Sequence, residues 1–188
     1  MENISVLLDT SIAWDYLCYS QNQDKYLARL NILNKRKEDL RNFIKLLDER
    51  QPGIHISWFC NGKADHKLKE KYSSKWEAMK GKYSIEMSSI PLTLLDGSHL
   101  LDGSIMLGGN SGGEYSFLTT SLKERFDTEH LETANEHNHY CWLTIDYKKT
   151  QQLRKRKIGN GITDKMIKMA MTPSELYLEL FERAIGQS

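Results

Sequence analysis

Clusters of apolar residues along this chain predict buried strands that are separated by helices. The run from Ile4 to Leu8 is mostly apolar rather than alternating, which is typical of a parallel strand covered on both faces. Residues 54–59, 115–120 and 140–145 have the same character. The apolar run of residues 90–95, which ends at Asp96, is a weaker candidate.

Helical spacing of apolar residues fills the segments between these strands. It predicts a short helix after Asp9 and a long one within residues 24–49, which Pro52-Gly53 ends. A polar and peripheral helix is expected after Asn61-Gly62, and a short one over residues 98–107. Near the end of the chain, an apolar stripe covers residues 162–170. Thr172-Pro173-Ser174-Glu175 then has the pattern of a helix start, with Thr as the cap and Glu three residues later.

Strands that alternate with helices indicate an α/β fold. We expect three layers, α/β/α, with a mostly parallel central sheet of four to five strands. The length of 188 residues fits a single domain over residues 1–188. Within it, residues 124–171 are a candidate insertion and residues 173–186 a closing helix.

Composition indicates the class of protein and its location, but not its function. The chain is 39% hydrophobic and 27% charged, which is typical of a globular protein, and no apolar run is long enough to span a membrane. The acidic start predicts no secretion signal, and three widely spaced cysteines fit a reduced, cytoplasmic location. The net charge of +1 predicts no polyanion partner, but residues 148–157 contain six bases and no acid. This stretch suits either phosphate contact or a solvated surface.

Asp9 is the most informative residue. It follows the apolar run directly, and ligands of open α/β sheets bind at the carboxyl ends of the strands. Its carboxylate is therefore either a ligand for a divalent metal or a cap for the helix that begins near Ser11.

Further acids stand at other predicted strand and helix boundaries. Asp96 ends an apolar run, Asp102 begins the predicted mid-chain helix, and Thr119-Thr120-Ser121 ends a predicted strand. Carboxylates gathered at strand ends suit metal-assisted phosphodiester hydrolysis. Asp-Gly is also a turn former, so a purely structural role for Asp96 and Asp102 remains open.

In this order the motifs resemble those of the PIN-like ribonucleases. Residues 6–11, Val-Leu-Leu-Asp-Thr-Ser, are similar to the family's first motif, in which the Asp binds metal. Residues 101–107 resemble its later Asp-led helix, residues 115–123 the strand that follows, and residues 171–178 the start of its closing helix. The resemblance implies an Mg²⁺- or Mn²⁺-dependent endoribonuclease. Asp9, Asp102 and Asp96 would hold the metal, Asp65 would assist, and Ser121 would orient a water or a ligand.

The chain departs from the family at three places. Ser121 occupies a position where the family has an acid, and the early Glu has no clear counterpart, Asp65 being the best candidate. The segment 124–171 is longer than the family's usual ending. A non-catalytic PIN-like module that binds RNA or a protein partner is therefore an alternative.

RNA is the expected partner, with a protein partner or a homodimer as alternatives and no membrane contact. Its phosphates would meet the basic side chains of the 148–157 stretch, which are Lys148, Lys149, Arg154, Lys155, Arg156 and Lys157.

Three other patterns in the sequence are typical of other kinds of site. Asp146 and Lys148 resemble the acid-x-Lys element of a different metal-dependent nuclease class, in which the Lys stabilises charge at the chemical step. Arg125 and His130 resemble the Arg/His pair of the helical HEPN ribonucleases, but the predicted strands argue against an all-helical bundle. Residues 136–141 contain two His and a Cys, and we expect a polar loop there.

Overall fold

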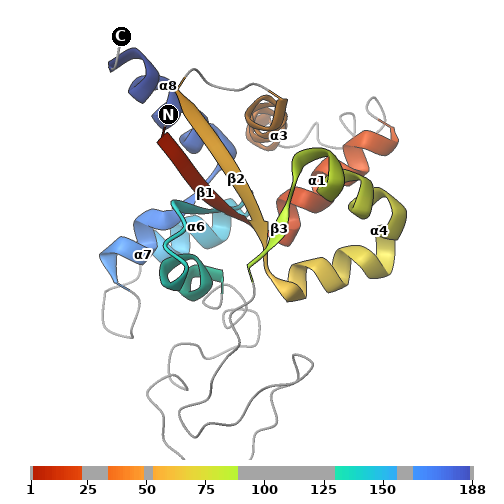
Figure 1. The fold of residues 1–188 in the computed structure, drawn as a ribbon. Helices are drawn as coiled ribbons and strands as arrows, with labels where there is room; N and C mark the ends of the chain where they lie inside the picture. Colours follow the sequence, from red (N-terminus) through yellow and green to blue (C-terminus); the bar gives the residue numbers. More distant parts are fainter. Residues whose placement is uncertain (1, 23–33, 49–52, 89–129, 156–162, 187–188) are drawn as a thin grey trace, which may run out of the picture.

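The described residues form a five-stranded parallel sheet with the strand order β3-β2-β1-β4-β5 (Figure 1). The structure is a computed structural model that describes residues 2–22, 34–48, 53–88, 130–155 and 163–186. Its strands are β1 (Glu2–Leu8), β2 (Ile54–Cys60), β3 (Glu86–Met87), β4 (Cys141–Leu143) and β5 (Ala170–Met171). Its labelled helices are α1 (Thr10–Gln21), α3 (Asn34–Asp48), α4 (Gly62–Tyr83), α6 (Tyr147–Lys155), α7 (Asp164–Met169) and α8 (Pro173–Gly186). Residues 130–136 are also helical.

The first strand lies in the middle of the sheet. Along β1, Leu8 is in register with Cys60 on one side and with Leu143 on the other. Side chains of β1 alternate between two hydrophobic clusters, so that Val6 and Leu8 enter one cluster and Leu7 the other. The prediction of a strand buried on both faces is therefore confirmed, and so is the α/β class with a parallel sheet.

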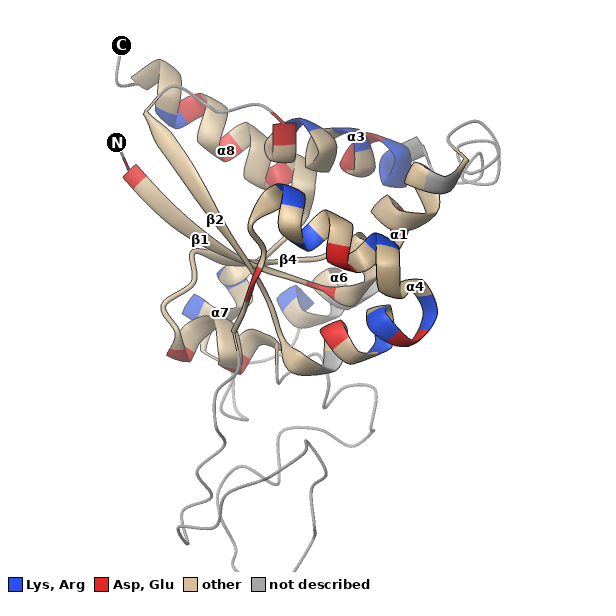
Figure 2. Cartoon of the chain, turned by 45° about the vertical axis from the view of Figure 1, so that its right-hand side comes forward, with Lys and Arg blue, Asp and Glu red and all other residues tan. Residues whose placement is uncertain are grey.

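Helices cover both faces of this sheet. Residues of α1, α3, α4 and α8 join the larger cluster, which contains Phe43, Trp76 and Leu176. The helix at 130–136 joins the smaller cluster with α6 and α7, around the fully buried Trp142. Figure 2 shows α6 and α7 on the opposite side of the sheet from α3 and α8.

Several predicted elements differ in the structure. The strand expected at 140–145 ends at Leu143, because the chain turns there into α6. The apolar stripe at 162–170 is helical only from Asp164 to Met169, and Ala170 begins β5. The helix after Asn61 is not peripheral, since Leu68 and Trp76 are fully buried. Residues 141–143 and 170–171 form strands of the sheet, and the candidate insertion at 124–171 stays a prediction. The predicted strand 115–120 and helix 98–107 lie outside the described residues.

The closing helix begins as its sequence predicted. In α8 the backbone N–H of Glu175 donates to Oγ1 of Thr172, and the carboxylate of Glu175 accepts from the N–H of Thr172 at 2.8 Å. This reciprocal pair satisfies two backbone donors that a helix start leaves open. Leu176 and Leu180 of this helix are fully buried, whereas Phe181 is 47% exposed.

Two further expectations concern location. In the described part of the chain, no helix combines the length and the apolar character that crossing a bilayer requires. Cys18, Cys60 and Cys141 are free thiols. The cytoplasmic location stays a prediction.

Candidate functional site at the end of β1

The strand order of the sheet reverses beside β1. The chain passes from β1 to β2 and β3 on one side, and then returns to place β4 and β5 on the other side. In open parallel sheets, ligands bind at the carboxyl ends of the strands where this reversal occurs. Asp9 follows β1 directly, and Thr144 follows β4. The two residues thus stand on either side of the switch point.

The side chain of Asp9 does not cap the helix that follows it. Asp9 has the backbone position of an N-cap, but its carboxylate accepts no hydrogen bond from the α1 backbone. Oδ2 instead accepts from the hydroxyls of Ser11 and Thr144, the latter at 2.8 Å. The backbone N–H of Asp9 donates to the Leu143 carbonyl at 2.9 Å, which ties the end of β1 to β4. Of the two roles predicted for the Asp9 carboxylate, metal ligand or helix cap, the structure therefore excludes the cap.

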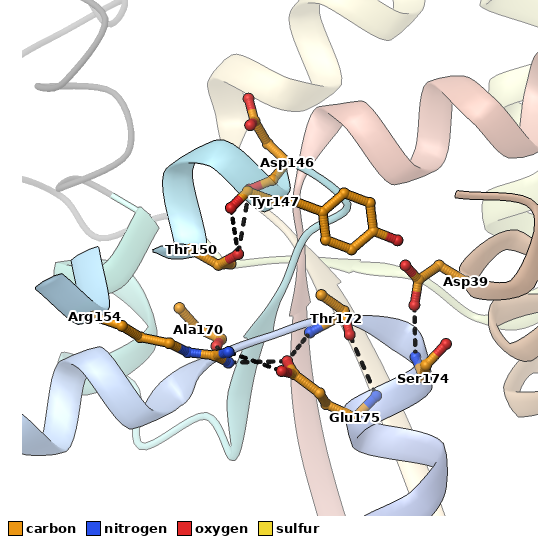
Figure 3. Close-up of polar contacts among 9 residues, drawn as sticks. All are labelled: Asp39, Asp146, Tyr147, Thr150, Arg154, Ala170, Thr172, Ser174 and Glu175. Atoms are coloured by element: carbon orange, nitrogen blue, oxygen red, sulfur yellow. Dashed lines mark hydrogen bonds and ion pairs between the residues drawn. The ribbon is translucent and has the colours of Figure 1, made fainter. Parts of the chain in front are cut away.

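Thr144 connects Asp9 to a second acid. Its Oγ1 donates to Asp9 and accepts from the backbone N–H of Asp146 at 3.3 Å. Asp146 precedes α6, where Thr150 donates to the Asp146 carbonyl at 3.5 Å. Figure 3 shows the carboxylate of Asp146 pointing away from Thr150. Asp146 and Asp9 therefore belong to one hydrogen-bonded unit at this edge of the sheet, although Lys148 stands within α6 rather than at a strand end.

A histidine of the helix at 130–136, His130, lies close to Asp9. Nε2 of His130 lies 4.0 Å from Oδ1 of Asp9, and the two side chains are only 8% and 11% exposed. The imidazole stacks on Trp142, with ring centroids 5.5 Å apart and an interplanar angle of 29°. In the sequence, His130 stands out only as part of the Arg/His pair that resembles the HEPN ribonucleases, and no pattern there links it to Asp9.

Asp65 is held within its own helix. Its carboxylate accepts from the indole N–H of Trp76 and forms ion pairs with Lys69 at 3.2 Å and Lys80 at 3.3 Å. Burial alone would raise the pKa of Asp65, but the hydrogen bonds from Trp76, Lys69 and Lys80 outweigh it and lower the pKa. These partners all belong to α4 and account for the position of Asp65, and the assisting role expected of it stays a prediction.

The remaining predicted site residues divide into two groups. Asp96, Asp102, Ser121, Arg156 and Lys157 lie outside the described residues. Within α6, Lys148 and Lys149 stand in the first turn, and Lys155 is exposed. Arg154 binds the carboxylate of Glu175 at 2.8 Å and the Ala170 carbonyl at 3.2 Å (Figure 3). Its guanidinium therefore serves the contact between α6 and α8, and the phosphate contact expected of Arg154 stays a prediction.

A larger basic surface lies on helices that the sequence had not singled out. Helix α4 contains seven lysines and three acids, and α3 contains five basic residues and three acids. Figure 2 shows the basic positions spread along both helices. Lys71 and Lys75 of α4 are exposed, and Nζ of Lys71 lies 4.3 Å from the ring centroid of Trp14. Helix α4 begins just after β2, so it starts at the same edge of the sheet as Asp9, and its lysines follow along the helix from there.

The oxygen atoms at this edge of the sheet are of the type that binds divalent metals, but the described residues offer too few of them. Carboxylate oxygens are the ligands that Mg²⁺ and Mn²⁺ prefer, and the hydrogen bonds to Asp9 all fall on Oδ2, so Oδ1 accepts none from the described residues. Over residues 2–22, 34–48, 53–88, 130–155 and 163–186, no three His, Cys, Asp or Glu side chains are grouped to hold an ion. Among these residues, Asp9 and its neighbours therefore do not by themselves make up a metal-binding group, and the expected Mg²⁺ or Mn²⁺ stays a prediction.

Comparisons with protein-family models, with curated proteins and with solved structures found no match for this chain.

Proposed function

We propose that this protein is a metal-dependent ribonuclease whose centre is built on Asp9. The observation that carries the proposal is the carboxylate of Asp9 at the switch point of the sheet. Two hydroxyls hold its Oδ2, and no helix N–H occupies the side chain. A buried carboxylate held in this way is poised to bind a cation through Oδ1.

Asp9 would be the first metal ligand. Asp146, whose backbone N–H donates to Thr144, would be the second. Asp102 and Asp96 remain the proposed further ligands, with Ser121 orienting a water. When bound, Mg²⁺ or Mn²⁺ would generate a hydroxide and stabilise the charge that develops on the phosphate oxygens. The protein's own part is to fix the carboxylate of Asp9 by the Ser11 and Thr144 hydroxyls, so that binding costs little reorganisation.

Phosphates of the RNA would lie along α4. The exposed Lys71 and Lys75 carry no ion pair among the described residues that would neutralise them, and Lys155 offers a further charge on α6. Such contacts are independent of sequence and weaken with salt. Replacing Lys71 and Lys75 together by Ala should lower the affinity for RNA and reduce the slope of log affinity against log salt by about 2.

The deciding experiment is cleavage of a labelled single-stranded RNA with Mn²⁺ or Mg²⁺ and with EDTA. Asp9→Asn and Asp146→Asn keep the shape of each side chain and remove its charge. Glu70→Gln makes the same change at an exposed site on α4 and serves as the matched control. Cleavage that requires metal, disappears in Asp9→Asn and persists in Glu70→Gln supports the proposal. Cleavage that survives Asp9→Asn contradicts it.

A non-catalytic RNA-binding or protein-binding module is the second candidate, as a monomer or a homodimer. It is favoured by the absence of a third acid near Asp9 among the described residues. In the same experiment it predicts RNA retained in EDTA with no cleavage under any condition. The acid-x-Lys mechanism is separated by Lys148→Ala, since only that mechanism needs the Lys at the chemical step.

A further inference from the structure

The two oxygens of the Asp9 carboxylate face different surroundings. Oδ2 accepts both hydrogen bonds, from Ser11 and from Thr144. Oδ1 faces Nε2 of His130 across 4.0 Å. This separation is too long for a hydrogen bond. With bonds of about 2.1 Å, adjacent ligands of an octahedral ion lie about 3.0 Å apart and opposite ligands about 4.2 Å apart, so this separation is close to that of two opposite ligands.

His130 is held in this place by its surroundings. Its ring stacks on Trp142, which is fully buried in the smaller hydrophobic cluster. Two further residues of its helix, Leu131 and Ala134, are also fully buried in that cluster. Because the helix and the ring are both anchored, Nε2 is presented to Asp9 with little freedom to turn away.

We propose that His130 is a nitrogen ligand of the cation that Asp9 holds, and that the centre therefore takes a first-row transition ion in preference to Mg²⁺. This inference rests on the proposed function, because it specifies the metal of the same site. Imidazole nitrogen suits transition ions, whereas Mg²⁺ is bound by oxygen ligands and water. A centre with Asp9 and His130 as ligands discriminates between the two ions through the histidine.

The competing role of His130 is purely structural: an aromatic ring that fills the space above Trp142, or a cation that pairs with Asp9. His130→Phe separates these roles, because Phe keeps a ring on Trp142 and removes the nitrogen. His130→Gln keeps a polar side chain. The matched control is His55→Gln, which removes an exposed histidine on β2. Thermal unfolding of each variant establishes that it is folded before metal is added.

The test is electron spin-echo spectroscopy of Mn²⁺ bound to the purified full chain, which detects a coordinated ¹⁴N directly. We expect nitrogen modulation in the wild type and in His55→Gln, and none in His130→Phe or His130→Gln. The Mn²⁺ dissociation constant should rise at least about tenfold in His130→Phe, while that for Mg²⁺ changes by less than about twofold. Wild-type Mn²⁺ without nitrogen modulation, or modulation unchanged in His130→Phe, overturns the inference.

Cleavage of RNA by the same samples distinguishes this inference from the proposed function. Nitrogen modulation that depends on His130, without any cleavage, supports the ligand and contradicts the nuclease. Cleavage that depends on Asp9, without nitrogen modulation, supports the nuclease and contradicts the ligand. If no Mn²⁺ binds in an Asp9-dependent manner, both are wrong.

Discussion

The hydroxyl of Thr144 donates to the carboxylate of Asp9 across the boundary between β4 and β1, at 2.8 Å. Thr144 is fully buried, and its oxygen also accepts from the backbone N–H of Asp146. Thr144→Val keeps the shape of the side chain but leaves both partners without this bond. Since unpaired buried polar groups are costly, we expect a loss of about 1–3 kcal/mol in the free energy of unfolding. Urea denaturation measures it.

Thr150→Val is the matched control for that change. Thr150 is also buried, but its hydroxyl donates to helix carbonyls at 3.1 and 3.5 Å, within its own helix. Carbonyls have a second lone pair and remain satisfied by the helix, so the loss should be below about 1 kcal/mol. Equal losses in the two valine variants would show that the Thr144 contact has no special weight.

Asp65 should matter for stability and not for cleavage. Trp76→Phe keeps a ring in the core but removes the donor to Asp65, and we expect a loss of about 1–3 kcal/mol. Asp65→Asn should destabilise the protein at neutral pH and leave RNA cleavage unchanged. A large loss of cleavage in folded Asp65→Asn would restore the catalytic role that its sequence position suggested.

The pH dependence of Asp65 has a definite sign. Its pKa in the folded protein is lowered below the ordinary value of 3.8, so the unfolded chain binds more protons as the solution is acidified. The stabilisation is fully present above that ordinary value and is lost as the pH falls through the folded pKa. The difference in stability between wild type and Asp65→Asn should therefore shrink below about pH 4.

His139 should make the protein sensitive to mild acid. Burial, and to a smaller extent the neighbouring His137, lowers the pKa of His139 from 6.5 to about 4. Its Nε2 lies 2.7 Å from the hydroxyl of Ser88. Between pH 6.5 and 4 the unfolded chain binds the proton more readily, so stability falls as the pH decreases, by at most about 3 kcal/mol. Denaturation at pH 7 and pH 4.5 should show a smaller difference in His139→Asn than in wild type or His55→Gln.

Arg154 and Lys155 are neighbours on α6 with opposite expected effects. Arg154→Ala removes the contacts with Glu175 and with the Ala170 carbonyl, and should cost about 1 kcal/mol of stability without weakening RNA binding. Lys155→Ala changes an exposed charge and should weaken RNA binding at low salt while stability stays constant. Filter binding and thermal unfolding of both variants check this pair. A reversed pattern would return Arg154 to the phosphate-binding surface.

The long elements were predictable because each has a strong local pattern. The run at β1 indicated burial on both faces, and Thr172 and Glu175 predicted the start of α8. Strands β3 and β5 were missed because two residues carry no periodicity, and they pair only because β2 and β4 offer free edges. The polar stretch at 136–141 was expected to be a loop, yet His139 is buried against Phe59 and Ser88.

The candidate site was predictable only at Asp9. Thr144 follows a three-residue strand, and the apolar run around it gave no sign that the strand ends before Ile145. The hydroxyl-bearing strand end that the sequence predicts, Thr119-Thr120-Ser121, lies outside the described residues, and in the structure Thr144 binds Asp9. His130 had no local signal, because its position depends on a helix packing across the sheet. Such contacts arise from tertiary packing, which no local pattern records.

The bond between Thr144 and Asp9 spans 135 residues of chain. At roughly 5–20 residues per second, a ribosome makes the carboxylate some 7 to 27 seconds before the hydroxyl that holds it. In the folded sheet β4 covers one edge of β1, so until residues 141–143 are made that edge lacks the partner it has in the structure. A nascent or truncated chain that lacks β4 therefore has the Asp9 carboxylate without the Thr144 hydroxyl, and this contact forms late in the synthesis of each molecule.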